Sequence, residues 1–261
     1  MSLTTVVYMI IFIILIFYFF KVRGKELDRL PAELFHLYEL EILDLSPDRE
    51  SCLFYKLHTV PPSISKLLNL RHLIMDTNEL QEIPKEISLL SSLERISLSN
   101  NKISTLPDSF SQLKKLVSLH FSNNLVKDFP LCICHLDGLE FLDLCDNKIE
   151  EVPEEIENLK KLESLHLFQN KLKCLPDSIC SLTAIRSLWL GNNEIESLPA
   201  RIGELRDLDW GQRHMTSLAL DGNPLVDPPA DVCKRGVGHI EVYFAKKSGT
   251  EKAKQNDQMK R

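Results

Sequence analysis

Three residues that could share a proton or bind a metal ion recur at one spacing: His120, Asp143 and His166 are each 23 residues apart. An aspartate between two histidines can accept a hydrogen bond from each and raise their proton affinity. Two histidines and a carboxylate could also begin a metal site. However, on neighbouring strands the outer histidines would lie about 10 Å apart, and the sequence offers no fourth ligand. We therefore expect a hydrogen-bonded polar strip and no metal or other cofactor.

Large aromatic residues occupy the same or adjacent positions of this spacing. Exposed aromatic side chains on a rigid surface are typical of protein-binding hot spots. The alternative is that these side chains only stack on one another and stabilise the array. We predict a protein-binding patch made of the following residues: His120, Phe141, Asp143, His166, Phe168 and Trp189.

Catalytic motifs are missing from the sequence. It contains no glycine-rich phosphate loop, no nucleophile elbow and no H-E-x-x-H pair. Cys132 and Cys134 form a C-x-C pair, but the apolar pattern makes the intervening Ile133 the buried residue, which argues against a metal site there. The sequence predicts a protein that is not an enzyme.

The spacing of 23 residues belongs to a repeat that runs through most of the chain. Its frame is L-x-x-L-x-L-x-x-N-x-I-x-x-L-P-x-x-I-x-x-L-x-x, as in residues 139–161. The asparagines of the frame are Asn78, Asn101, Asn124, Asn147, Asn170 and Asn193. The prolines are Pro61, Pro84, Pro107, Pro130, Pro153, Pro176 and Pro199. This period and consensus predict a leucine-rich repeat solenoid of about eight to nine repeats over residues 27–226.

Each repeat should contribute one strand and one short helical turn, which makes the fold α/β. Leucines of the x-L-x-L-x segment point into the core, and the residues between them line the concave face of a curved parallel sheet, here called the sheet face. The asparagine can satisfy backbone groups of neighbouring turns. The proline suits the first position of a helical turn on the convex side.

Residues 3–20 carry no charge, and as a helix they would be about 27 Å long, just enough to span a bilayer. We predict a single-pass transmembrane helix over residues 1–22. A cleaved signal peptide and a hydrophobic cap on the first repeat are the alternatives. Lys21, Arg23 and Lys25 follow the segment and nothing basic precedes it, so the repeats should lie on the cytoplasmic side. Seven cysteines without a capping cluster also indicate reduced thiols.

Two insertions and a C-terminal segment depart from the frame. Residues 49–56 and 209–214 should be loops that leave the solenoid, because the register resumes after each. Residues 227–247 have apolar residues at helical intervals and predict a capping helix. Residues 248–261 are polar and predict a disordered basic tail. Residues 246–261 contain six basic and two acidic residues, a net charge of +4. Because the whole chain has a net charge of −6, residues 1–245 have a net charge of −10. This negative charge argues against nucleic acid as a partner.

The repeat frame, together with the cap G-N-P-L-x-x-P-P-x-x-V-C-x-x-G-x-x-x-I-x-x-Y-F from Gly222 to Phe244, resembles intracellular leucine-rich repeat proteins of the Ras-suppressor and Scribble type. The resemblance implies an adaptor for intracellular signalling, with a small GTPase or a signalling enzyme as partner. We expect a membrane-anchored scaffold that binds a protein on its sheet face. The alternative is a structural spacer at the membrane whose sheet face has no ligand.

Overall fold

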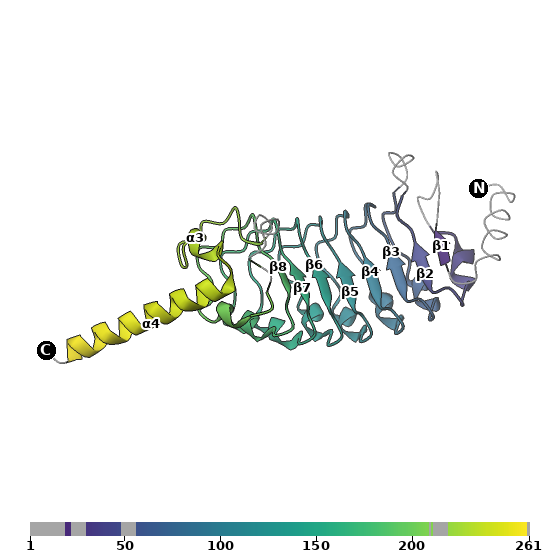
Figure 1. Cartoon of the computed structure of the whole chain (residues 1–261). Coiled ribbons are helices and arrows are strands. Elements are labelled where there is room, and N and C mark those ends of the chain that lie inside the picture. The colour runs from purple at the N-terminus through teal and green to yellow at the C-terminus, as the bar shows by residue number, and fades with distance from the viewer. Residues whose placement is uncertain (1–18, 22–29, 48–55, 209, 211–218, 260–261) are drawn as a thin grey trace. The chain divides into compact units, whose positions relative to one another are not determined.

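The computed structural model of the chain describes residues 19–21, 30–47, 56–208, 210 and 219–259 (Figure 1). The chain divides into two compact units. Unit 1 consists of Met1–Val126 and Pro130–Phe141, and unit 2 of Lys127–Phe129 and Leu142–Arg261. Each unit is built from the predicted repeats and is described by itself.

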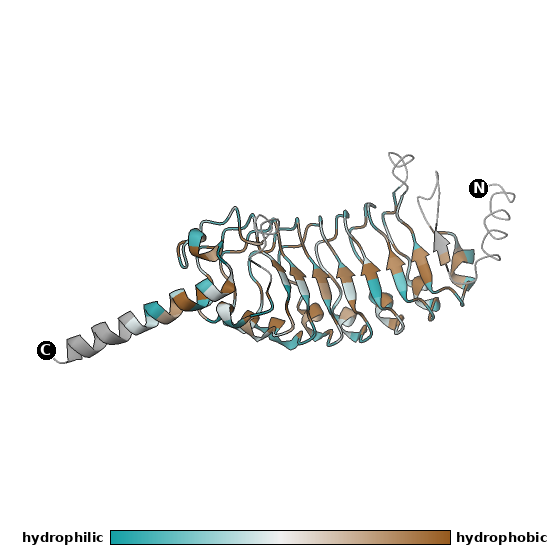
Figure 2. Cartoon of the chain, viewed as in Figure 1, coloured by the Kyte–Doolittle hydropathy of each residue, from teal (hydrophilic) through white to brown (hydrophobic). Residues whose placement is uncertain are grey.

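Unit 1 contains a parallel sheet in which strands pair in chain order. Its strands are β1 (Phe19–Lys21), β2 (Ile42–Asp44), β3 (His72–Ile74), β4 (Arg95–Ser97) and β5 (Ser118–His120). The central residue of each strand from β2 to β5 is fully buried. It is the register partner of the central residue of the next strand. Figure 2 shows apolar residues recurring in the strands and short helices of the repeats. The predicted alternation of core and sheet-face residues is confirmed.

Short 3₁₀ helices return the chain behind the strands of unit 1. They are η1 (Ala32–His36), η2 (Pro62–Lys66), η3 (Lys85–Leu89), η4 (Asp108–Gln112) and η5 (Leu131–His135). The frame proline precedes each helix instead of occupying its first position, as Pro84 does with φ −66° and ψ 141°. Proline fixes φ but leaves ψ free, so it can hold this extended cap while its carbonyl accepts the Ile87 N–H at 3.1 Å.

Unit 2 continues the same pattern and ends in two α-helices. β6 (Phe141–Asp143) begins with the last residue of unit 1, and β7 (Ser164–His166) pairs in parallel with β8 (Ser187–Trp189). The helices are η6 (Glu154–Asn158), η7 (Asp177–Ser181), η8 (Ile202–Glu204), α3 (Ala230–Cys233) and α4 (Val237–Met259).

The frame asparagines bond the repeats together from within. In unit 1 the Asn101 side-chain amide donates to the carbonyls of Met75 and Leu98, both at 2.9 Å, and its oxygen accepts the Leu80 N–H at 3.1 Å. In unit 2 Asn170 repeats this arrangement, as the sequence predicts. Each asparagine therefore satisfies backbone groups that would otherwise be buried without partners.

The predicted transmembrane helix is wrong at its C-terminal end. Residues 3–18 lie outside the described residues, but Phe19–Lys21 forms β1, whose residues pair with β2 from Ile42 to Asp44. Aromatic residues favour strands, and the edge of β2 offers backbone partners that a helix end cannot use. Within the described ranges, no helix is long and apolar enough to cross a membrane.

Trp210 corrects the expectation that residues 209–214 form a loop leaving the solenoid. The other residues of this segment, and most of 49–56, lie outside the described residues. Trp210 is only 2% exposed, and its Nε1–H donates to the Leu188 carbonyl of β8 at 2.9 Å. Burial of the large indole, with its polar atom satisfied, holds this part of the insertion in the core.

The C-terminal helix α4 packs on η8 through its first two turns, where Ile240 and Phe244 are buried. Gly203 of η8 permits this approach, because a Cβ there would lie 2.8 Å from the Glu241 Cα. Figure 1 shows α4 then projecting from unit 2. The expectation of a disordered tail from residue 248 differs from the structure, since α4 continues to Met259. Lysine, alanine, glutamate and glutamine in this segment favour a helix even without burial.

Candidate functional site

The most tightly organised part of the sheet face in unit 2 is a stacked pair of rings. β7 ends at His166 and β8 at Trp189, and the two residues are partners in the parallel register. Their ring centroids are 3.6 Å apart and their planes differ by 2°. The indole covers the imidazole so well that His166 is only 7% exposed. The expectation that the His166 side chain faces solvent is therefore wrong, while Trp189 remains half-buried at the surface.

Polar atoms of this pair differ in how they are satisfied. Nε2 of His166 lies 3.2 Å from the Ser187 hydroxyl, which fixes the ring from the neighbouring strand. In the part of the chain that the structure describes, the buried Nε1–H of Trp189 has no hydrogen-bond partner. A buried donor without an acceptor costs about 1–3 kcal/mol, and such groups are rare in folded proteins.

Phe168 and Asp143 complete the predicted residues of unit 2. Phe168 follows β7 and is half-buried, and its carbonyl accepts the Asp146 N–H at 2.9 Å. The carboxylate of Asp143 accepts the Cys145 N–H at 3.0 Å, so it caps the end of its own strand. These hydrogen bonds fix the positions of Phe168 and Asp143 on the sheet face.

Unit 1 contains the two remaining predicted residues, His120 and Phe141. Their ring centroids are 4.6 Å apart with planes inclined by 31°, and Nε2 of His120 lies 3.0 Å from the Ser118 hydroxyl. The structure thus brings the predicted patch together as two aromatic pairs, one in each unit. The three-residue strip of His120, Asp143 and His166 includes residues of both units and stays a prediction.

The sheet face of unit 1 also holds a hydrogen-bonded group that was not predicted from the sequence. The Asp76 carboxylate accepts the Ser97 hydroxyl and the Ser99 N–H, both at 2.7 Å, and Ser122 donates to the Ser99 hydroxyl at 3.0 Å. Burial raises the pKa of Asp76 despite these bonds. The signal in the sequence was a run of serines at the repeat spacing beside one aspartate.

A family model described as a leucine-rich repeat region matches residues 48–140 and 131–214. The chain belongs to the leucine-rich repeat proteins. A solved leucine-rich repeat protein of Leptospira interrogans is 31% identical, with a TM-score of 0.69 over 79% of this chain and 55% of that one. This chain therefore spans just over half the length of that protein. A comparison with curated proteins gives no match.

Two further solved structures are plant receptors with bound partners. One is the leucine-rich repeat ectodomain of the Arabidopsis thaliana membrane receptor kinase GASSHO1/SCHENGEN3 in complex with CASPARIAN STRIP INTEGRITY FACTOR 2, 28% identical with a TM-score of 0.64 over 75% of this chain and 23% of that one. The other is the plant peptide hormone receptor RGFR1 in complex with RGF2, 25% identical with a TM-score of 0.65 over 80% of this chain and 32% of that one. Repeats of this class are generally protein-interaction scaffolds and are typically not enzymes.

The buried cysteines of this leucine-rich repeat chain are poorly suited to nucleophilic chemistry. Cys132 and Cys134 are buried, and burial raises the pKa of the Cys132 thiol to about 11. Burial, helped by the Asp143 charge, also raises the pKa of Cys145. The thiolate is the reactive form of cysteine, so the raised pKa values of Cys132 and Cys145 make these two side chains poor nucleophiles. Among the described residues, no three His, Cys, Asp or Glu side chains are placed to hold a metal ion.

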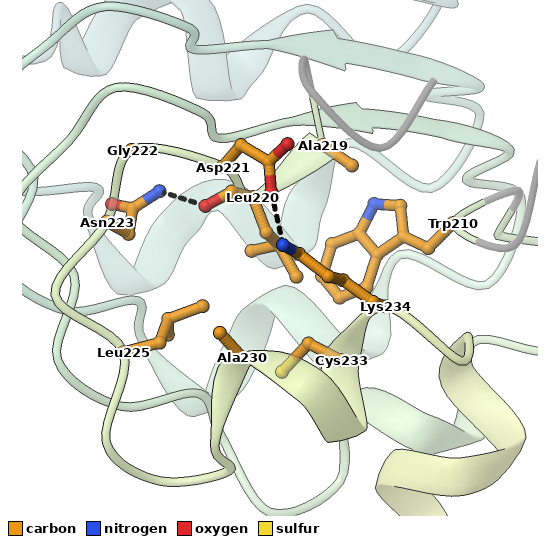
Figure 3. A pocket seen from close by; sticks show the side chains of 10 residues that line it. All are labelled: Trp210, Ala219, Leu220, Asp221, Gly222, Asn223, Leu225, Ala230, Cys233 and Lys234. Atoms are coloured by element: carbon orange, nitrogen blue, oxygen red, sulfur yellow. Dashed lines mark hydrogen bonds and ion pairs between the residues drawn. The ribbon is translucent and has the colours of Figure 1, made fainter. Parts of the chain in front are cut away.

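A small pocket near the end of the repeats in unit 2 has a volume of about 150 Å³ (Figure 3). Trp210, Leu220 and Cys233 form its apolar walls, and an ion pair of 3.7 Å between Lys234 and Asp221 crosses it. Pockets for small-molecule ligands usually measure about 300–1,000 Å³. This pocket is thus a packing gap beneath α3.

Proposed function

We propose that this leucine-rich repeat protein is a membrane-anchored scaffold that binds a protein partner on its sheet face, on the cytosolic side of the membrane. The observation that carries the proposal is the Trp189 platform, defined as Trp189 stacked on His166 with Phe168 beside β7. Two large apolar side chains stay partly open to solvent there, on strands whose backbone positions are fixed by the repeat.

The platform has the character of a binding hot spot for three reasons. Trp189 and Phe168 present large rigid apolar surfaces, which gain free energy when a partner covers them. His166 cannot change its ring position without breaking the stack and its contact with Ser187, so little conformational entropy is lost on binding. The indole N–H of Trp189 is one of two buried side-chain polar atoms without a partner among the described residues, the other being Ser178 Oγ, and such groups are concentrated at functional sites.

The class of partner follows from two independent supports. The plant receptors named above were solved with bound partners, which favours a protein or peptide ligand for this chain as well. The resemblance to the Ras-suppressor and Scribble type makes a small GTPase or a signalling enzyme the first partner to test. A role in signal transduction would follow from either.

The membrane part of the proposal is supported by the uncharged residues 3–18, which precede β1, and by the basic residues Lys21, Arg23 and Lys25. Protease treatment of sealed microsomes should digest the repeats. Protection of the repeats would overturn the cytosolic orientation without affecting the sheet-face site.

Photo-crosslinking tests the sheet-face site directly. Benzoylphenylalanine is placed at Phe168 in cells, and at Ser99 as the matched control, since Ser99 holds the same repeat position in unit 1. We expect one discrete protein adduct at position 168 that is lost when Trp189→Ala is added. Equal adducts at both positions, or none at position 168, would contradict the proposal and favour a spacer.

A further inference from the structure

We infer that the N-terminal edge of unit 1 rests in the interfacial layer of a lipid bilayer, with Phe19, Tyr38 and Leu68 as its apolar contacts. The inference rests on the proposed membrane anchor. It adds a second membrane-binding surface, built by the repeats themselves, and it fixes which part of the protein lies against the lipid.

The first argument is the length of chain available to the anchor. β1 begins at Phe19, whose backbone is already in register with Ile42 of β2. The uncharged segment that remains is residues 3–18, which as a helix would measure about 24 Å, against a hydrocarbon core about 30 Å thick. A span shorter than the core draws its flanking residues toward the lipid, and here the flanking residues are the first strand of the sheet.

The second argument is the apolar surface found at this edge. Phe19 is 41% exposed, Tyr38 51% and Leu68 58%. Tyr38 and Leu68 hold the same position in consecutive repeats, seven residues after Pro31 and Pro61. The Asn69 side chain donates to the Tyr38 carbonyl at 2.8 Å and ties the two turns together.

The chemistry of the edge fits a bilayer better than a protein partner. Tyrosine is enriched at the membrane–water interface, where its ring can be apolar and its hydroxyl hydrated. Lys21, Arg23 and Lys25 occur in the adjoining sequence and complement anionic headgroups.

Depth-dependent fluorescence quenching tests the surface in the full-length chain. The variants Tyr38→Trp and Leu68→Trp are reconstituted into vesicles of phosphatidylcholine and phosphatidylserine, with and without lipids brominated near the headgroup. Leu131→Trp is the matched control, because Leu131 is 52% exposed in η5 of the same unit. The emission of native Trp189 and Trp210, measured in the unchanged protein, is subtracted.

We expect the added emission at positions 38 and 68 to shift to the blue and to lose most of its intensity with brominated lipid. The emission at position 131 should be unaffected. Flotation of the same vesicles reports the anchor separately. Failure to float would overturn the anchor and this inference together, whereas flotation without quenching at positions 38 and 68 would overturn only the inference. Agreement between the two tryptophan variants guards against one of them being misfolded.

Discussion

The sheet faces of the two units have the same repeat backbone but differ in how fully their polar side chains are hydrogen-bonded. In unit 1, Asp76, Ser97, Ser99 and Ser122 form hydrogen bonds with one another and leave few polar atoms for a ligand. In unit 2, the corresponding region presents the Trp189 platform, with apolar surface partly open and one indole N–H unpaired. Repeats of equal length therefore build a self-satisfied surface in one unit and an incomplete one in the other.

The contrast shows which residues encode function in this protein. Frame residues are alike in both units, since Asn101 and Asn170 make equivalent bonds to the turns before them. The side chains between the core leucines differ from repeat to repeat. Stability should therefore respond to frame substitutions equally in the two units, whereas binding should respond more strongly to substitutions in the Trp189 platform of unit 2 than to substitutions in the serine group of unit 1.

The largest expected effect comes from a frame asparagine. Asn170→Ala removes an amide that donates to the Leu144 carbonyl at 2.9 Å and an oxygen that accepts the Ile149 N–H at 3.0 Å. Each buried backbone group left without a partner costs about 1–3 kcal/mol, so the free energy of unfolding should fall by about 3 kcal/mol or more. Asn101→Ala in unit 1 should lose a similar amount in urea denaturation. A loss confined to one unit would break the equivalence of the frames.

A medium effect is expected from the glycine that lets α4 pack on η8. Gly203→Ala places a methyl group 2.8 Å from the Glu241 Cα and should destabilise the protein by about 1–3 kcal/mol through overpacking. Gly138→Ala in unit 1 meets only carbonyl oxygens, at 3.3 and 3.4 Å, and should cost less. Gly238→Ala has nothing within 4 Å and is the control for helix propensity. Equal melting temperatures for the Gly203 and Gly238 variants would show that α4 does not need this close contact.

The smallest effects concern pH and have opposite signs in the two units. Burial raises the pKa of Asp76, so its carboxylate opposes folding at neutral pH, and this penalty disappears as pH falls through the raised pKa. A hydrogen bond from Lys247 lowers the pKa of Asp227, so its contribution is present above the unfolded pKa of about 3.9 and is lost as pH falls through the lowered pKa.

In the unchanged protein, Asp76 should make the free energy of unfolding rise as pH falls, and Asp227 should make it fall. Asp76→Asn should therefore abolish the rise and Asp227→Asn the fall, each effect being about 1 kcal/mol or less. Urea midpoints measured between pH 7 and pH 3 provide the check, with the unchanged protein as reference. Parallel pH profiles for the two variants would contradict the assigned causes.

The periodic part of the fold was predictable from the sequence because each frame residue has one structural task. Leu43 and Leu165 are buried because alternate strand residues must face the core, and Asn170 bonds the turns because its amide both donates and accepts there. The ends were harder to predict. Phe19 reads as part of an apolar span, but an unpaired strand edge gives its backbone a different partner.

The candidate site was predictable in position but not in detail. Repeat spacing places His166 and Trp189 side by side on adjacent strands. It does not reveal that the rings stack face to face, because that depends on side-chain rotamers set by neighbours such as Ser187. Trp210 was missed for a related reason: an insertion between two repeats has no register from which its burial could be read.

The most direct test of the account compares partner capture by matched double variants of the full-length protein. Phe168→Ala/Trp189→Ala removes the apolar surface of unit 2, and Ser99→Ala/Ser122→Ala alters the sheet face of unit 1. Affinity for the protein identified by crosslinking at position 168 should fall about thirtyfold or more in the first variant, the loss expected of a hot spot, and by less than about threefold in the second. Equal affinities, or a larger loss in the serine variant, would contradict the claim that unit 2 carries the binding site.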